Sequence, residues 1–354
     1  MNTEDTYRAL ANHLNSFPQG FPSTEDGVEL ELLAYLFTPA EADFALHLSQ
    51  NFTPLDTVTG GLDLLVEDPR SLVKAMTSKG LVSMKLGKEG VEVKLLPFIV
   101  GFYENQVNRM DETFARLFER YYSFVHQELF SCEPQFHRVV PVNETINTHI
   151  EILPEDNVMT LLSSKKAWAV LDCVCRKQKQ LIGEGCEHPL RMCLAMSDFP
   201  NAFDGLTEMD ALDLEGALAI LDEASAAGLV HTVANQKGNI SYICNCCTCS
   251  CGILRGIAET HIANVVARSA YVAKVDQDVC IVCGICEERC QFDAITIADT
   301  SEIMSERCVG CGVCAKACPE LAITLQLRPS DEILPVPNSF EDWLESRQLA
   351  RGLA

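Results

Sequence analysis

Residues 280–290 read CIVCGICEERC and residues 308–319 read CVGCGVCAKACP, and these two stretches carry the most specific pattern in the chain. Each contains four cysteines in the order C-x-x-C-x-x-C-x-x-x-C. An offset of 28 residues relates Cys280 to Cys308, so the segment is an internal duplication. Cysteines grouped at such short spacings, in a chain without signs of secretion, are typical of metal ligands.

The two stretches resemble the bacterial-type ferredoxins with two [4Fe–4S] clusters, in which three cysteines of a run bind one cluster and the fourth binds the other. The resemblance covers roughly residues 271–328 and implies transfer of single electrons at low potential between redox partner proteins. It also implies two ligand sets. One cluster would take Cys280, Cys283, Cys286 and Cys318, and the other would take Cys308, Cys311, Cys314 and Cys290.

Two other interpretations of these eight cysteines fit less well. Structural zinc also takes four thiolates, but usually from two C-x-x-C pairs that lie well apart in sequence. A disulfide framework is typical of small secreted chains. This chain has 354 residues and opens with MNTEDTYRAL, which has no apolar signal-peptide core. The spacing therefore favours iron–sulfur clusters.

Short strands are expected around both runs. Residues 271–275 enter the first run, residues 294–297 leave it, and residues 322–325 repeat that exit after the second. Gly284 and Gly312 occupy the same place in the two copies, where glycine lets backbone N–H groups turn toward cluster sulfurs. These flanks predict two copies of one loop–helix–strand unit.

One position departs from the ferredoxin pattern. A proline usually follows the fourth cysteine of each run, and Pro319 does so after the second. Gln291 takes that place after Cys290 in the first run. We expect the first turn to be less rigid as a result, with all eight cysteines still present.

The overall composition restricts the partners and the compartment. A formal charge of −23 argues against nucleic acid or an anionic membrane surface and suits a redox partner with a basic patch. No run of 18 apolar residues predicts a membrane span. A reducing cytoplasm is therefore expected, and the oxygen sensitivity of [4Fe–4S] clusters indicates an anaerobic or microaerobic host.

The fold class expected is α+β with several domains. Residues 1–130 predict a winged-helix-like domain with a connecting helix, because helical patterns over 28–50 and from Asp68-Pro69 to Lys79-Gly80 precede a β-hairpin at 81–95. Its first 100 residues hold seven Lys/Arg and fourteen Asp/Glu, so protein docking or homodimerisation is favoured over DNA binding. The remaining assignments are a linker at 131–159, an α/β cysteine-rich domain at 160–268 with a helix over 207–227, a dicluster ferredoxin fold at 269–330, and a tail helix at 331–354.

Nine further cysteines lie in the middle domain, in two groups that each begin where a predicted strand ends, so that two adjacent strands could present the thiols side by side. They are Cys173, Cys175, Cys186, Cys193, Cys244, Cys246, Cys247, Cys249 and Cys251. In an extended chain the two cysteines of a C-x-C pair lie on one face, about 6.6 Å apart. That spread suits two corners of a cluster better than a disulfide.

Three interpretations of the nine cysteines remain open: one or two further iron–sulfur clusters, structural zinc, and reactive or redox thiols. His188 and His231 are candidate mixed ligands for zinc, and Arg176 is either a charge partner of a cluster or a solvated base. Cys132 stands alone and is expected to be a buried small apolar residue. This middle segment and the front end also resemble uncharacterised ferredoxin-fused proteins of anaerobes.

The function expected is electron transfer rather than stand-alone catalysis. The chain contains no G-x-x-x-x-G-K-[ST] motif for ATP and no G-x-G-x-x-G after a strand for a dinucleotide. Two alternatives stay open: a redox-sensing winged-helix transcription regulator, and an iron–sulfur subunit of a larger oxidoreductase complex.

Overall fold

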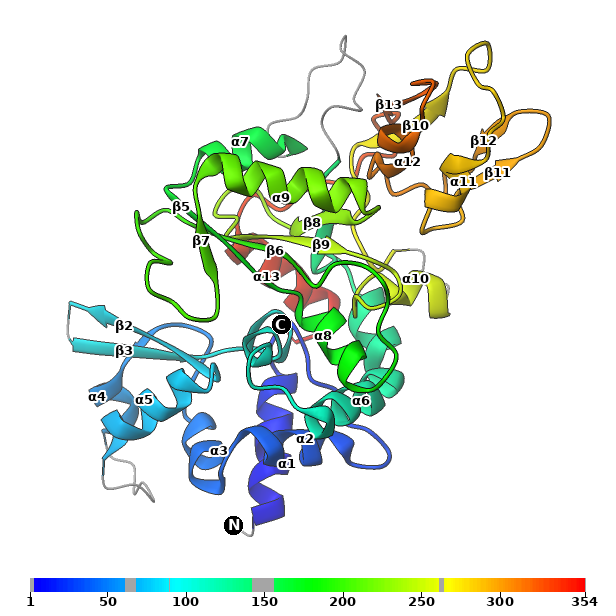
Figure 1. Ribbon diagram of the computed structural model, residues 1–354. Helices are drawn as coiled ribbons and strands as arrows, with labels where there is room; N and C mark the ends of the chain where they lie inside the picture. Colours follow the sequence, from blue (N-terminus) through cyan, green and yellow to red (C-terminus); the bar gives the residue numbers. More distant parts are fainter. Residues whose placement is uncertain (1–2, 61–67, 89, 142–155, 261–263, 354) are drawn as a thin grey trace. The chain divides into compact units, whose positions relative to one another are not determined.

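The protein is described from a computed structural model that covers residues 3–60, 68–88, 90–141, 156–260 and 264–353 (Figure 1). It is a mixture of helix and sheet, consistent with the expected α+β class. The chain divides into two compact units. One comprises residues 1–132, 180–184 and 344–354, and the other comprises residues 133–179 and 185–343.

The first unit consists of helices and a small antiparallel sheet whose strand order is β1-β3-β2. Its elements, in chain order, are α1 (Thr3–Asn15), α2 (Val28–Leu36), α3 (Pro39–Ala45), β1 (Thr53–Pro54), α4 (Leu55–Thr59), α5 (Pro69–Ser78), β2 (Val82–Gly87), β3 (Gly90–Leu95), the short η1 (Phe98–Phe102) and η2 (Glu104–Gln106), and α6 (Glu112–Ser131).

Local sequence signals account for several of these boundaries. Thr38 begins α3 with a capping box, in which its side chain accepts from the Glu41 backbone and Glu41 reaches back. Asp68 caps α5 with Pro69 at the first helical position. The strands β2 and β3 pair as the expected hairpin, whose turn residue Glu89 lies outside the described residues. Helices α2, α3 and α5 and the hairpin follow in the predicted order, whereas α1, β1 and α4 were not predicted. The winged-helix assignment itself stays a prediction.

Aromatic side chains from α6 and from the segment before it form the core of this unit. Phe114, Phe118 and Tyr121 are buried, and the ring of Tyr103 stacks on that of Phe118 with centroids 4.0 Å apart. Phe124, from the same helix, is 47% exposed. Most aromatic residues of α6 and of the segment before it are therefore core residues.

The second unit is built on a six-stranded antiparallel sheet whose order is β4-β8-β9-β6-β5-β7. The elements of this part are β4 (His137–Val139), α7 (Val158–Ser163), β5 (Ala167–Asp172), α8 (Val174–Leu181), β6 (Arg191–Ser197), β7 (Asp210–Leu212), α9 (Leu214–Ala226), β8 (Val230–Ala234), β9 (Tyr242–Cys246) and α10 (Arg255–Thr260). Helix α9 packs on the sheet through Ala217 and Leu221, which join Val170, Leu194 and Ile243 in one apolar core.

Two sequence-based boundaries in this unit were wrong. The segment 131–159 was expected to be an irregular linker, but its described part contains β4, a buried strand paired with β8. The prolines of this segment suggested an irregular chain. The strand itself has no alternating polar pattern, because all three of its residues are buried. The helix expected over 207–227 begins only at Leu214, since Asp213 caps it and residues 210–212 pair with β5 as β7.

The C-terminal part of the second unit contains the duplicated segment. Its elements are β10 (Tyr271–Val275), α11 (Ile285–Arg289), β11 (Ile295–Ile297), β12 (Ser301–Ile303), α12 (Val313–Ala317) and β13 (Ile323–Leu327). Strand β10 pairs with β13 and β11 pairs with β12. Gly284 and Gly312 begin the two short helices with φ of 81° and 82°, which favours glycine. The expected repeat is therefore present in the backbone.

The tail forms the expected helix, α13 (Phe340–Ala350), and Ser339 caps it by accepting from the Asp342 N–H. Trp343 is buried and donates its indole N–H to the Gln135 carbonyl at 2.8 Å, within the second unit. No described helix, here or elsewhere in the ranges given above, is long and apolar enough to cross a membrane.

Candidate metal centres

Four cysteines of the duplicated segment line one cavity. Cys280, Cys283 and Cys286 come from the first run, and Cys318 comes from the end of the second. Gly284 lies between two of them and allows the chain to turn into α11, which carries Cys286. Thiolates that surround one cavity in this way fit a [4Fe–4S] cube.

The other four cysteines line a second cavity. Cys308, Cys311 and Cys314 come from the second run, and Cys290 comes from the end of the first. Each cavity therefore takes three cysteines from one run and one from the other. These are the two groups of four that the resemblance implied as ligand sets.

Hydrogen bonds to sulfur follow the duplication. The Ala294 N–H lies 3.4 Å from the Cys290 sulfur, and the Ala322 N–H lies 3.3 Å from the Cys318 sulfur. Donors of this kind stabilise thiolate charge and tune the potential of a bound cluster. A contact between the Ser301 hydroxyl and the Cys286 sulfur, at 3.3 Å, is the exception, because residue 329 is proline in the corresponding place.

Burial opposes ionisation of these thiols when no cation is near. It raises the pKa of Cys311 to about 12 and also raises the pKa of Cys290. For Cys314, burial is again the main cause of a pKa well above the ordinary value. A cavity of low polarity therefore holds thiolates only when iron or another cation compensates their charge.

Gln291 has a defined structural role in place of the usual proline. Its side-chain oxygen accepts from the Thr248 backbone N–H at 2.7 Å, and its side-chain amide donates to the Gly228 carbonyl at 2.5 Å. The first ferredoxin-like run is thereby hydrogen bonded to the cysteine-rich sheet region of the same unit. Proline at this position would have no side-chain donor or acceptor for either bond.

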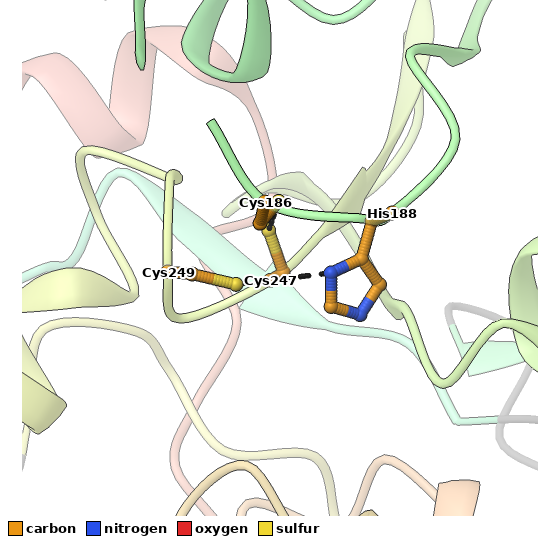
Figure 2. Close-up of side chains that lie close together, drawn as sticks. All are labelled: Cys186, His188, Cys247 and Cys249. Atoms are coloured by element: carbon orange, nitrogen blue, oxygen red, sulfur yellow. Dashed lines mark hydrogen bonds between the residues drawn. The ribbon is translucent and has the colours of Figure 1, made fainter. Parts of the chain in front are cut away.

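The nine middle-domain cysteines separate into two groups, one of which includes a histidine. Figure 2 shows this four-ligand group, made of Cys186, His188, Cys247 and Cys249. Their ligand atoms all lie within 4.8 Å of one another. The sulfurs of Cys186 and Cys247 are 3.9 Å apart, and Nδ1 of His188 is 3.7 Å from the Cys249 sulfur.

The electrostatics of the four-ligand group favour a thiolate. Interaction with Cys249, followed by His188 and the charge of Arg176, lowers the pKa of Cys247 to about 3. The same thiolate raises the pKa of His188. A tetrahedral metal with ligands at about 2.3 Å sets its sulfurs about 3.8 Å apart. The group therefore suits a single zinc or iron ion.

The other six cysteines interact with one another in pairs and are here called the six-thiol ring. They are Cys173, Cys175, Cys193, Cys244, Cys246 and Cys251. Their strands are not the adjacent pair that the sequence suggested, since β6 lies between β5 and β9 and contributes Cys193. The extended C-x-C geometry holds for Cys244 and Cys246 within β9, but Cys175 lies in helix α8.

The sequence also singled out His231, Arg176 and Cys132, and the structure shows the surroundings of each. His231 is not with the thiols, because its ring nitrogens contact the Asn245 side-chain oxygen at 2.6 Å and the Ser225 hydroxyl at 2.9 Å. Arg176 is 1% exposed, so its interpretation as a solvated base was wrong. Cys132, expected to be buried, is half-buried.

Sequence reasoning missed Ser301 and Thr248, the polar partners of Cys286 and Gln291. Neither residue carries a sequence signal, because each comes close through tertiary pairing of distant segments. The sequence also did not distinguish the four-ligand group from the six-thiol ring. Only Cys249-to-Cys247 spacing, with a histidine two residues after Cys186, hinted at a mixed site.

Two cavities that are each lined by four cysteines are typical of an iron–sulfur protein. Comparison with known families agrees: a model described as the 4Fe-4S binding domain matches residues 273–296 and again residues 301–324. No curated protein and no solved structure matches the chain. The chain contains a C-terminal domain of two adjacent 4Fe-4S repeats, and it binds two [4Fe–4S] clusters.

Proposed function

We propose that this protein carries single low-potential electrons between redox partner proteins. The observation that carries the proposal is the pair of cavities, each lined by three cysteines of one repeat and the last cysteine of the other. A bound [4Fe–4S] cluster supplies a one-electron couple. Two such sites in one small domain are suited to passing electrons onward rather than to transforming a substrate.

The roles of the cysteines follow from this grouping. Cys280, Cys283, Cys286 and Cys318 would bind one cluster, and Cys308, Cys311, Cys314 and Cys290 would bind the other. The N–H groups of Ala294 and Ala322 would each stabilise the charge on a ligand sulfur. The hydroxyl of Ser301 would do so for Cys286 in one cluster only, which makes the two potentials unequal.

An additional metal in the four-ligand group completes the proposal. Cys186, His188, Cys247 and Cys249 would bind one tetrahedral ion. Thr248, between two of these ligands, is hydrogen bonded to Gln291, which follows Cys290. With iron in the site this connection would pass electrons, and with zinc it would fix the position of the ferredoxin repeat.

The first unit would serve as the partner-binding part of the protein. Its helix and hairpin order supports a winged-helix-like domain. The chain carries a formal charge of −23, which repels nucleic acid and attracts a basic protein surface. Its partner is therefore a redox protein or a second copy of this chain.

Anaerobic purification with iron analysis and EPR spectroscopy tests the proposal. Reduction of the full chain should give signals of two interacting [4Fe–4S] clusters, and at least about eight irons per chain. Cys311→Ser should remove one of the two signals, while Cys132→Ser, outside both cavities, should remove neither. Fewer than eight irons after reconstitution would contradict the dicluster assignment.

A further inference from the structure

Three neighbouring strands bring the six-thiol ring together at one end of the sheet. Cys173 directly follows β5, Cys193 lies in β6, and Cys244 lies in β9. Strand β6 pairs with both of the others. Leu194 pairs with Ile243, so continuing this antiparallel register by one residue sets Cys193 opposite Cys244.

The thiols interact pairwise around a closed ring. Cys173 interacts with Cys175 and with Cys193, and Cys193 interacts in turn with Cys244. The ring closes through the remaining pairs, which are Cys244–Cys246, Cys246–Cys251 and Cys251–Cys175. Each thiol thus has two thiol neighbours, one on either side.

This arrangement differs from a site for a single ion. A tetrahedral metal needs three or four sulfurs that are all within about 3.8 Å of one another. Among the described residues, such a compact set occurs in the four-ligand group and not in the ring. Sulfurs spread around a ring suit several metal atoms held together by bridging sulfide, because each metal then needs only one or two protein thiolates.

Arg176 gives independent evidence of an anion at the ring. Its guanidinium is 1% exposed, and one nitrogen donates to the Asn245 carbonyl at 2.9 Å. Nε and Nη2 have no hydrogen-bond partner within the part of the chain that the structure describes. A buried charge without compensation is unfavourable, and the thiols whose negative charge acts on this guanidinium include Cys173, Cys193 and Cys246 of the ring and Cys247 of the four-ligand group.

We propose that the six-thiol ring binds a polynuclear iron–sulfur cluster, separate from the two clusters of the ferredoxin repeats and from the ion of the four-ligand group. The inference goes beyond the proposed electron carrier and does not depend on it. Its ligands would be Cys173, Cys175, Cys193, Cys244, Cys246 and Cys251, with Arg176 donating to the cluster or to its thiolates.

Binding is a ligand exchange. Ferrous and ferric iron together with inorganic sulfide are the co-reactants, so no oxidant or reductant is needed. Each iron–thiolate bond replaces an S–H bond, and the released proton goes to solvent. No protein disulfide forms or breaks. Two thiolates beyond the usual four give the ring a larger negative charge than a ferredoxin cage, which explains a buried arginine at this position.

Counting iron and acid-labile sulfide on the full chain tests the proposal. The protein would be purified without oxygen and reconstituted with iron and sulfide. Two [4Fe–4S] clusters account for about eight irons and eight sulfides, so we expect both counts to exceed eight. Cys193→Ser and, separately, Cys244→Ser should return the sulfide count to about eight, and the iron count to about eight plus any single ion of the four-ligand group, while the ferredoxin EPR signals remain.

Matched variants separate this site from the others. Cys311→Ser should lower the count through the ferredoxin site and leave the excess in place, and Cys249→Ser should remove one metal ion without sulfide. Arg176→Met should lose the excess iron faster in air than Arg176→Lys, which keeps a cation.

Wild-type counts of eight or fewer would overturn the proposal, even if the ring variants fail to fold. An excess of zinc without sulfide would overturn it as well, and so would ring variants that keep the excess sulfide. A different result would contradict the electron-carrier proposal: wild-type protein that shows no ferredoxin EPR signals after reduction.

Discussion

The side-chain oxygen of Gln291 accepts a hydrogen bond of 2.7 Å from the backbone N–H of Thr248. Gln291 follows Cys290, which lines the cavity of the second run, and Thr248 lies between Cys247 and Cys249 of the four-ligand group. A few covalent bonds and one hydrogen bond therefore separate two candidate metal centres. This connection arises at the position where the first repeat departs from the usual proline.

Replacing Gln291 by proline should separate the two regions without removing the cluster ligands. The variant loses bonds to the Thr248 N–H and the Gly228 carbonyl, about 1–3 kcal/mol in total. Hydrogen exchange at the Thr248 amide should become faster. Gln291→Glu keeps an acceptor for Thr248 and should retain most of the protection there. Unchanged exchange in Gln291→Pro would show that the bond does not form in solution.

Ser301→Ala should lower the reduction potential of the cluster bound by Cys286. The hydroxyl lies 3.3 Å from the Cys286 sulfur, and a donor there favours the more negative reduced state. Loss of a hydrogen bond that stabilises the reduced cluster by about 1 kcal/mol lowers the potential by about 40 mV for a one-electron couple. Redox titration followed by EPR measures the shift. Ser305→Ala, at an exposed serine in the same segment, is the control, and an equal shift in both variants would contradict the assignment.

Cys249→Ser should remove one metal ion per chain and leave the iron of the ferredoxin repeats unchanged. Cys249 is the exposed member of the four-ligand group, so a chelator should also reach this ion first. His188→Ala should weaken binding less than Cys249→Ser, because three thiolates remain. Metal analysis before and after chelation gives the stoichiometry. A variant that keeps its full metal content would exclude this site.

Glu104 should make the first unit less stable as the pH rises from about 5 to 7. Burial raises the pKa of its carboxyl from 4.5 to about 7, although a backbone bond from Gly101, at 2.6 Å, favours the charged form. The raised folded pKa means that its stabilising effect is complete below the unfolded pKa and is lost as the pH passes the folded one. Because the residue is half-buried, we expect about 1–2 kcal/mol.

Glu104→Gln is the matching variant, since its amide oxygen still accepts from Gly101. Urea unfolding at several pH values should show a wild-type midpoint that falls between pH 5 and 7 relative to that of the variant. Parallel curves for the two proteins would mean that Glu104 ionises normally.

Much of the secondary structure was predictable because its signals are local. The caps at Thr38 and Asp68, the β2–β3 hairpin and the helix starts at Gly284 and Gly312 depend on residues a few positions apart. Strand β4 was not predictable, since three buried residues acquire their conformation from pairing with β8. Partial predictability of this kind is expected where tertiary pairing overrides local preference.

The sequence by itself determined the iron–sulfur chemistry of the C-terminal repeats, because short cysteine spacings constrain the loop around a cluster regardless of the surrounding fold. Only the tertiary structure decided how the nine middle-domain cysteines are divided. Strand β6 lies between β5 and β9 and adds Cys193 to the ring, while the turn after β9 carries Cys247 and Cys249 to Cys186 and His188. Thiols far apart in sequence become neighbours only through strand order and register, which residue spacing does not encode.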